Sequence, residues 1–308
     1  MHTLRAPATV AGVGLFTGTD ASVTFEPATP GSGLQVAIDD AEPFPATTEH
    51  LSDEPVHEVF ARVPARHTAL RDPVTGRSVY TVEHALAALV GLDVRDAVVR
   101  VRGVHAKVEV PIMDGSALAF VNAMLETGLL ASLDDDAPRS IKPKSVVRVP
   151  SDPDPDADPP PMAASVRPLA PGERPSYAYA LDYTDAFAAM GLPEPHPIPP
   201  ATVRWTLGDR DAFVREIAPA RTFSLRQEVE PLRTLGMFER FTPAELLVIG
   251  ADGPIDNVWR FPDEAARHKL LDLIGDLALA GRPIAGHIEA RGAGHAMNHA
   301  LARALRQR

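Results

Sequence analysis

The segment RHKLLDLIGDL, residues 267–277, carries the pattern that decides the fold and the chemistry of this sequence. It lies within a predicted helix from Asp263 to Ala280. On a helical wheel of ~100° per residue, one arc is apolar, and the opposite arc carries His268, Asp272 and Asp276, each four residues apart. A histidine and an aspartate one turn apart can chelate one divalent metal ion. The same stripe is also typical of the solvated face of an ordinary amphipathic helix, and both interpretations stay open at this point.

A weak internal repeat pairs this helix with an earlier one, predicted over Thr81–Leu92. A shift of 184 residues aligns His84, Leu86, Leu89 and Gly91 with His268, Leu270, Leu273 and Gly275. A strand (97–102 or 284–290) and a further helix (116–127 or 294–306) follow each of the two. Chance can produce such a match because leucine and glycine are common. We favour a duplicated α+β unit, in which two related domains present both histidines to a shared cleft.

The residues around His84 are consistent with a catalytic metal. Glu83 precedes this histidine and lies within reach of a water molecule that the histidine would hold. His84, His268 and Asp272 would make three ligands and leave a fourth position for water, as a catalytic zinc site requires. A Glu-His pair in a helix is weak by itself, and an ordinary structural pair is the alternative.

A second histidine of interest follows a glycine turn near the C-terminus. Residues 291–296 predict a strand end, a turn and a helix start, with His295 at the N-terminus of the helix. The helix dipole there favours anions and is expected to lower the pKa of the imidazole. His295 is therefore a candidate general acid or anion contact, or alternatively a loop residue.

Composition excludes several classes of function. The chain has 308 residues, 45% of them hydrophobic, no cysteine and a formal charge of −11. The charge argues against nucleic-acid and anionic-lipid binding, and the lack of cysteine excludes disulfides and thiolate chemistry. The longest apolar run, Ala85–Leu92, is too short to cross a bilayer, and no secretory signal is recognisable. We expect an acidic, soluble, intracellular protein.

Two polar segments suggest how the chain is divided. The run LDDDAP, residues 133–138, predicts a boundary between domains 1–133 and 134–308. Residues 151–161 are acidic and rich in proline, and residues 193–200 are also rich in proline, so both are expected to be loops.

Six motifs together resemble one known family, the zinc-dependent UDP-3-O-acyl-N-acetylglucosamine deacetylases of lipid A biosynthesis. They follow the family's order and span nearly the whole chain: GVGLFTG (12–18), TVEHALAAL (81–89), VPIMDGSA (110–117), ARTF (220–223), RHKLLDLIGDL (267–277) and GHAMNH (294–299). The resemblance implies two α+β domains, each a sheet backed by helices, with the helix layers packed between the sheets and the site at their junction.

The resemblance also implies a role for each matching residue. The metal ligands would be His84, His268 and Asp272, with Zn²⁺ expected and Fe²⁺ compatible. Further roles concern catalysis and substrate: Glu83 as general base for the water at the metal, His295 as general acid or cationic stabiliser held by Asp276, Thr222 as oxyanion donor, and Lys269, Phe223 and Gly294 as substrate contacts.

The implied reaction is hydrolysis of the acetamide of UDP-3-O-acyl-N-acetylglucosamine to the free amine and acetate. Two features depart from the family: Phe16 replaces the usual histidine, and the stretch 224–262, the expected acyl-passage insertion, lacks the usual glycine-rich segment. Phe238 and Phe241 are candidates for an altered acyl wall, with core packing as the alternative. Two other functions therefore stay open, a metal-dependent deacetylase of a different N-acetyl sugar nucleotide and a non-catalytic sugar-nucleotide-binding paralogue.

The expected partner is the acylated UDP-amino-sugar alone. We expect a cytoplasmic monomer with no stable membrane anchor, whose only membrane contact is peripheral and through the lipid substrate.

Overall fold

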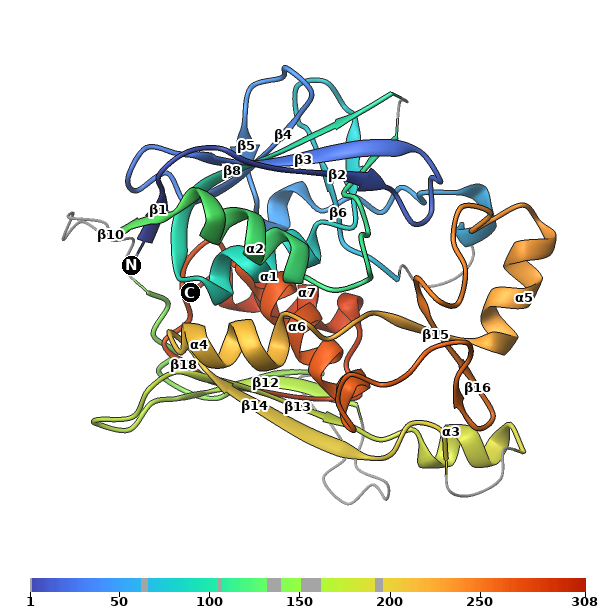
Figure 1. Ribbon diagram of the computed structural model, residues 1–308. Helices are drawn as coiled ribbons and strands as arrows, with labels where there is room; N and C mark the ends of the chain where they lie inside the picture. The colour runs from blue at the N-terminus through green and yellow to red at the C-terminus, as the bar shows by residue number, and fades with distance from the viewer. Residues whose placement is uncertain (1, 62–65, 105–106, 132–139, 151–161, 192–195) are drawn as a thin grey trace.

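Two β-sheets enclose a layer of helices in the computed structural model of the chain (Figure 1). The structure describes residues 2–61, 66–104, 107–131, 140–150, 162–191 and 196–308. A smaller group of elements projects at one end: α3 (Thr184–Ala189), α5 (Arg226–Thr234), β15 (Phe223–Leu225) and β16 (Leu247–Gly250). This arrangement confirms the α+β class and the sandwich with helices between the sheets.

The first sheet has seven strands, with the long strand β8 (Val94–Gly103) at its centre. The others are β1 (His2–Leu4), β2 (Ala8–Val13), β3 (Asp20–Pro27), β4 (Leu34–Ile38), β5 (Phe44–Pro45) and β10 (Leu129–Ala131). In β3 the side chains of Ala21, Val23 and Phe25 are buried and alternate with more exposed ones, because successive side chains of a strand point to opposite faces. Val23 and Phe25 therefore share the buried face of the strand.

The glycine-rich segment after β2 forms a tight turn into β3, as the sequence predicts. The Gly14 amide donates to the carbonyl oxygen of Thr19 at 2.9 Å. The fully buried carboxylate of Glu109 then accepts the backbone amides of Phe16 at 3.1 Å and Thr17 at 2.8 Å. The turn is thereby tied to the sheet interior.

The second sheet has five strands, centred on β18 (Gly286–Arg291). The others are β11 (Val147–Val149), β12 (Ala163–Pro168), β13 (Ser176–Leu181) and β14 (Ala201–Thr206). Strand β18 begins two residues later than predicted, because Ile284 forms only an isolated bridge with Ile141.

Tyr183 does not extend the buried face of β13, although Tyr177, Tyr179, Leu181 and Tyr183 alternate along the sequence as the residues of one strand face do. The strand ends at Leu181, and the Asp182 carboxylate accepts the backbone amide of Thr184 at 3.0 Å, which turns the chain into α3. Side chains of Asp commonly end a strand in this way.

Smaller elements complete the described chain. They are β6 (Ala69–Arg71), β7 (Ser78–Tyr80), β9 (Val108–Glu109), β17 (Gly253–Pro254), the 3-10 helices η1 (Thr48–His50) and η2 (Glu58–Phe60), α4 (Arg210–Ala212) and the π-helical turn η3 (Phe213–Ile217). Residues 210–217 are thus divided between a short α-helix, α4, and the π-helical turn η3. Helix α5 was not predicted, because Pro231 and many charged residues lie within it.

The helix layer repeats one unit twice. Helix α1 (Glu83–Gly91) is followed by β8 and α2 (Leu118–Thr127), and helix α6 (Glu264–Ala278) is followed by β18 and α7 (His295–Arg306). Helices α1 and α6 pack directly against each other (Figure 1). Helix α1 begins two residues later than predicted, because Thr81 has a left-handed backbone with φ of 61°.

The crossing of α1 and α6 is close because a glycine lies at the contact. A Cβ atom at Gly275 would lie 2.1 Å from the carbonyl oxygen of Glu83. The small residue at this position therefore allows the backbone of one helix to approach the backbone of the other closely.

Some predictions lie outside the described residues. The boundary between residues 133 and 134 and the acidic loop 151–161 are among them, so the division into domains 1–133 and 134–308 stays a prediction. Within the described residues, we find no helix whose length and hydrophobicity would let it cross a bilayer.

Substitution Gly275→Ala is expected to destabilise the protein. Alanine in a helix interior normally stabilises by about 1 kcal/mol relative to glycine, but overpacking at this contact should cost about 1–3 kcal/mol. Urea unfolding of both proteins measures the difference. Gly294→Ala is a matched control, since a Cβ there meets nothing within 4 Å, and it should change stability by less than about 1 kcal/mol. Equal or greater stability of Gly275→Ala would contradict the close-crossing interpretation.

Candidate functional site

The crossing of α1 and α6 brings three predicted ligands together. The Nε2 atom of His268 lies 3.3 Å from Oδ1 of Asp272, and the Nε2 atom of His84 lies 3.5 Å from the same oxygen. One ligand atom from each residue lies within 4.8 Å of the others, and all three residues are buried. The polar stripe of α6 therefore faces the helix junction, which excludes a solvated helix face.

The chemistry of these donors fits a divalent metal ion. Oδ1 of Asp272 is buried and has no hydrogen-bond partner among the described residues, although such oxygens are normally paired. Nδ1 of His268 lies 3.1 Å from the carbonyl oxygen of Ala220, so its Nδ1–H donates there and Nε2 keeps a free lone pair. His268 and the carboxylate thus point unprotonated atoms at one place, and Nε2 of His84 lies beside the same carboxylate oxygen.

Electrostatics keeps two of these ligands deprotonated. Burial lowers the pKa of His268 to about 3. Burial opposes the charge of Asp272, but His268 and Lys269 hold the pKa of this carboxyl well below its usual value. A metal ion requires deprotonated ligands, so neither group would have to lose a proton near neutral pH.

Glu83 lies at the start of α1, beside the three ligands. Its side chain is buried, and Oε2 accepts the backbone amide of Thr68 at 2.9 Å. Burial raises the pKa of Glu83 above the usual glutamate value. A raised pKa brings a carboxylate closer to what a general base needs near neutral pH.

His295 is held by a buried carboxylate from α6. Its Nδ1 lies 2.9 Å from Oδ2 of Asp276, which also accepts the side-chain amide of Asn298 at 2.9 Å. Burial opposes the charge, yet Asp276 raises the pKa of His295 to about 9. The expected lowering by the helix N-terminus was wrong, because a full charge in hydrogen-bond contact outweighs a helix dipole.

A second group of possible ligands, Asp276, His295 and His299, also lies within 4.8 Å. Its atoms already have hydrogen-bond partners. Oδ1 of Asp276 accepts a hydrogen bond from the hydroxyl of Thr68, and Oδ2 accepts one from Nδ1 of His295. The first group, with an unpaired oxygen at its centre, is the better metal site.

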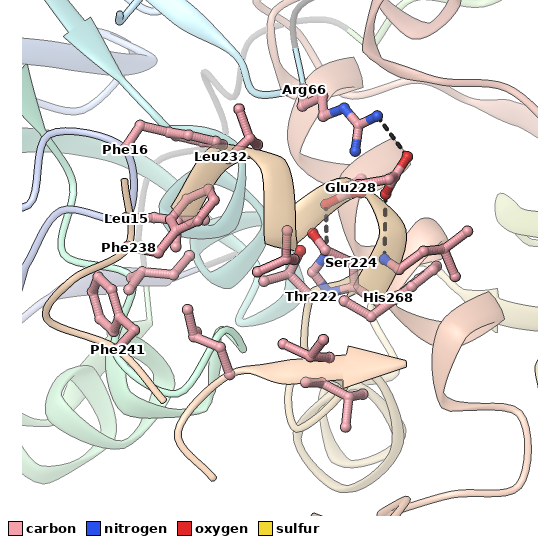
Figure 2. Close-up of a pocket in the computed structure, with 18 of the residues that line it drawn as sticks. Leu15, Phe16, Arg66, Thr222, Ser224, Glu228, Leu232, Phe238, Phe241 and His268 are labelled. Atoms are coloured by element: carbon pink, nitrogen blue, oxygen red, sulfur yellow. Dashed lines mark hydrogen bonds and ion pairs between the residues drawn. The ribbon is translucent and has the colours of Figure 1, made fainter. Parts of the chain in front are cut away.

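A cavity of about 400 Å³ is lined by all three residues of the first group, His84, His268 and Asp272. Figure 2 shows its apolar side, with Leu15, Phe16, Phe238 and Phe241, and its polar side, with Thr222, Ser224 and His268. At its edge, Arg66 and Glu228 form an ion pair of 2.7 Å.

The remaining predicted site residues meet at this cavity as well. Its lining includes Glu83, His84, Thr222, Phe223, His268, Lys269, Asp272, Gly294 and His295, while Asp276 is buried behind His295. Lys269 donates to Oδ2 of Asp272 at 3.1 Å and lies 5.8 Å from the centre of the Phe223 ring.

Thr222 owes its position to a buried ion pair next to it. The side chain of Arg221 donates to Glu264, at the start of α6, at 2.8 Å. The backbone amide of Thr222 donates to the carbonyl oxygen of Gly115 at 2.6 Å. The loop before β15 is therefore anchored to both halves of the chain.

Phe16 lies in an aromatic group instead of making a polar contact. Its ring centre is 5.3 Å from that of Phe60, 5.1 Å from that of His67 and 6.1 Å from that of Phe238. Phe238 and Phe241 line the cavity, and Phe241 is also buried, so the wall and core interpretations both apply to it.

Several site residues were not found from the sequence. His299 had a usable signal, since it follows His295 by four residues on one helix face. Thr68, Arg66 and Glu228 had none, because they come from a loop and from an unpredicted helix.

Comparison with known proteins identifies relatives over the full chain. The model of the UDP-3-O-acyl N-acetylglycosamine deacetylase family (LpxC) matches residues 1–307. A relative from Synechocystis sp. named UDP-3-O-acyl-N-acetylglucosamine deacetylase is 33% identical over 305 residues, which cover 99% of this chain and 98% of the relative. Relatives of the same name from Myxococcus xanthus and Phenylobacterium zucineum are each 34% identical, covering 98% and 100% of this chain and 85% and 93% of the relatives.

The three convergent ligands predict binding of one divalent metal ion per chain. Protein stripped with a chelator and re-equilibrated with Zn²⁺ should hold about one equivalent by elemental analysis. His268→Ala should lose it, because two ligands remain. His287→Ala is the matched control, since His287 lies on β18 and bonds Ser176 and Glu173 instead. Full metal content in His268→Ala would place the metal elsewhere.

Proposed function

Because the chain belongs to the UDP-3-O-acyl N-acetylglycosamine deacetylase family, we propose that it hydrolyses the acetamide of UDP-3-O-acyl-N-acetylglucosamine. The products would be acetate and the free 2-amino sugar nucleotide, as in the committed step of lipid A biosynthesis. The observation that carries this proposal is the meeting of five residues in the lining of a largely apolar cavity: His84, His268, Asp272, Glu83 and His295.

We propose that His84, His268 and Asp272 hold a zinc ion. When bound, zinc supplies a Lewis acid that polarises the amide carbonyl and lowers the pKa of water. Two imidazoles and a carboxylate suit Zn²⁺, and Fe²⁺ is compatible with the same donors.

Glu83 is the proposed general base. Its carboxylate lies beside the ligand group and is oriented by the Thr68 amide, so it can take a proton from the attacking water. The hydroxyl of Thr222, at the cavity wall, would donate to the oxygen that becomes negative when the water adds to the carbonyl.

His295 is the proposed general acid. Asp276 holds Nδ1 of the ring, which leaves Nε2 as the other ring atom that can exchange a proton. A raised pKa keeps this imidazole protonated near neutral pH, so it can protonate the departing nitrogen.

The cavity favours an acylated substrate over a non-acylated one. Lys269, Phe223 and Gly294 would contact the sugar-nucleotide part, while the aromatic side chains Phe238 and Phe241 would contact the acyl chain. The segment 224–262 supplies much of this apolar wall, in keeping with an acyl passage. The cytoplasmic location, the monomeric state and a peripheral membrane contact stay predictions.

Acetate release tests the proposed function directly. Purified protein should release acetate from the acylated UDP-N-acetylglucosamine and much less from the non-acylated sugar nucleotide, and chelation should stop both. Preference for the non-acylated compound would instead support a deacetylase of another N-acetyl sugar nucleotide. Absence of metal-dependent release from either would support a non-catalytic paralogue.

Glu83→Ala should lower kcat by about 10²- to 10⁴-fold while the fold persists, because it removes the base without removing a ligand. Steady-state kinetics and circular dichroism measure the two effects. Glu126→Ala, on the exposed face of α2, is the matched control and should retain activity. Near-normal turnover by Glu83→Ala would refute the base assignment.

The pH profile should report His295. Its acidic form is present below a pKa of about 9 and lost above it, so kcat/KM should fall as the pH rises through about 9. Asp276→Asn removes the charge that raises this pKa and should move the alkaline limb down by at least about one pH unit. An unmoved limb in Asp276→Asn would mean that another group controls it.

A further inference from the structure

Thr68 is the residue that touches both halves of the proposed machinery. It immediately precedes β6, is fully buried, and its carbonyl oxygen accepts the amide of Val82 at 3.2 Å, beside the start of α1. Its amide donates to Glu83 at 2.9 Å, and its hydroxyl donates to Oδ1 of Asp276 at 2.5 Å. One residue thus contacts the proposed base and the carboxylate that holds the proposed acid.

The hydroxyl of Thr68 has three neighbours and only one proton. Asp276 Oδ1 lies at 2.5 Å, His299 Nε2 at 2.8 Å and His295 Nδ1 at 3.5 Å. An ionised carboxylate only accepts, so the proton must go to Asp276. The hydroxyl oxygen must then accept from His299, which requires a proton on Nε2 of His299.

The same matching of donors and acceptors determines which ring nitrogen of His295 faces Asp276. Its Nδ1 lies closer to Oδ2 of Asp276, at 2.9 Å, than to Thr68, so Nδ1–H donates to the carboxylate. The other ring nitrogen, Nε2, is then the atom left to meet substrate. The Nε2 proton of His299 thus follows from the Thr68 hydroxyl, and the Nδ1 proton of His295 follows from the Asp276 carboxylate.

Donors hold the Asp276 carboxylate on both oxygens. His295 and Asn298 donate to Oδ2, Thr68 donates to Oδ1, and Nε2 of His299 lies 3.4 Å from Oδ1. The three contributors from α7 lie at spacings of three and four residues, so they share the face that packs on α6. Thr68 and His299 are not among the residues that line the cavity, so any effect they have on the reaction must pass through others.

We propose that Thr68 and His299 are positioning residues for the acid and base of this site. His299 donates to Thr68, Thr68 directs its single proton to Asp276 and its amide to Glu83, and Asp276 in turn orients His295. This inference rests on the proposed deacetylase function for its kinetic consequence, but its tautomer assignment stands on the geometry alone.

Kinetics of paired variants tests the chain of contacts. Thr68→Val removes the hydroxyl with little change of shape and should lower kcat by about 10- to 100-fold, with KM changed less than about 2-fold. Thr68→Ser should restore most of the loss. His299→Leu should lower kcat by about 3- to 10-fold, and His299→Gln, which keeps a donor, should lose less.

A double variant separates a relay from two independent effects. Because His299 acts through the Thr68 hydroxyl, Thr68→Val with His299→Leu should be no slower than Thr68→Val alone. Fully multiplicative losses, or a loss confined to KM, would overturn the proposal. Thr47→Val is the matched control, since Thr47 is buried and its hydroxyl has no partner in the described part of the chain, and it should keep kcat within about 2-fold.

Nuclear magnetic resonance of the wild-type protein labelled with ¹⁵N-histidine tests the tautomers without activity. His299 should carry a proton on Nε2, and a His299 protonated on Nδ1 alone would overturn the proposal even if every variant failed to fold. Wild-type acetate release is measured in parallel. If the wild type releases none, the proposed function fails while the tautomer test still decides this inference. If it is active and Thr68→Val is equally active, only this inference fails.

Discussion

The contact of α6 with the start of α1 is the constraint on which the whole site depends. At Gly275 the two helices approach so closely that no side-chain carbon fits, and the neighbouring turns then place His84 opposite His268 and Asp272. Neither helix could bury these polar side chains alone, because a lone histidine or aspartate in an apolar core costs free energy unless it is paired. Each helix supplies the partners of the other, so the junction is at once a packing contact and a candidate metal site.

At the same junction, one histidine is neutral and another is protonated. Burial leaves His268 neutral, with a pKa of about 3, whereas Asp276 raises the pKa of His295 to about 9. Both imidazoles lie beside a carboxylate, but for His268 burial outweighs the nearby Asp272, whereas for His295 the Asp276 carboxylate that accepts its Nδ1–H outweighs burial. A neutral imidazole is what a metal ligand must be, and a protonated one is what a general acid must be. Helix α6 supplies Asp272 to one and Asp276 to the other from a single stripe.

The sequence predicted what is periodic or contained in a motif and missed what depends on contacts between distant segments. The stripe His268, Asp272 and Asp276 and the repeat with His84 favoured a shared cleft, the family resemblance implied packed helix layers, and the two helices do meet. The predicted direction of the His295 pKa was wrong, because it was inferred from the helix terminus alone and not from Asp276, nineteen residues away, which the resemblance implied would hold the ring. Thr68 and Arg66 lie in a loop without periodicity, and α5 contains a proline and many charged residues. No local pattern therefore predicted these two residues or this helix.

The aromatic group around Phe16 shows how the cavity wall accommodates a phenylalanine at this position. The backbone of this turn is held by Glu109 through main-chain amides, so its path does not depend on which side chain residue 16 carries. A phenylalanine there can pack against Phe60 from η2 and Phe238 from the segment after α5. Because aromatic contacts are broad and apolar, this end of the cavity presents a largely hydrocarbon surface. The side chain at residue 16 therefore affects what the cavity wall can bind. It does not alter the junction of α1 and α6, which holds the proposed chemistry.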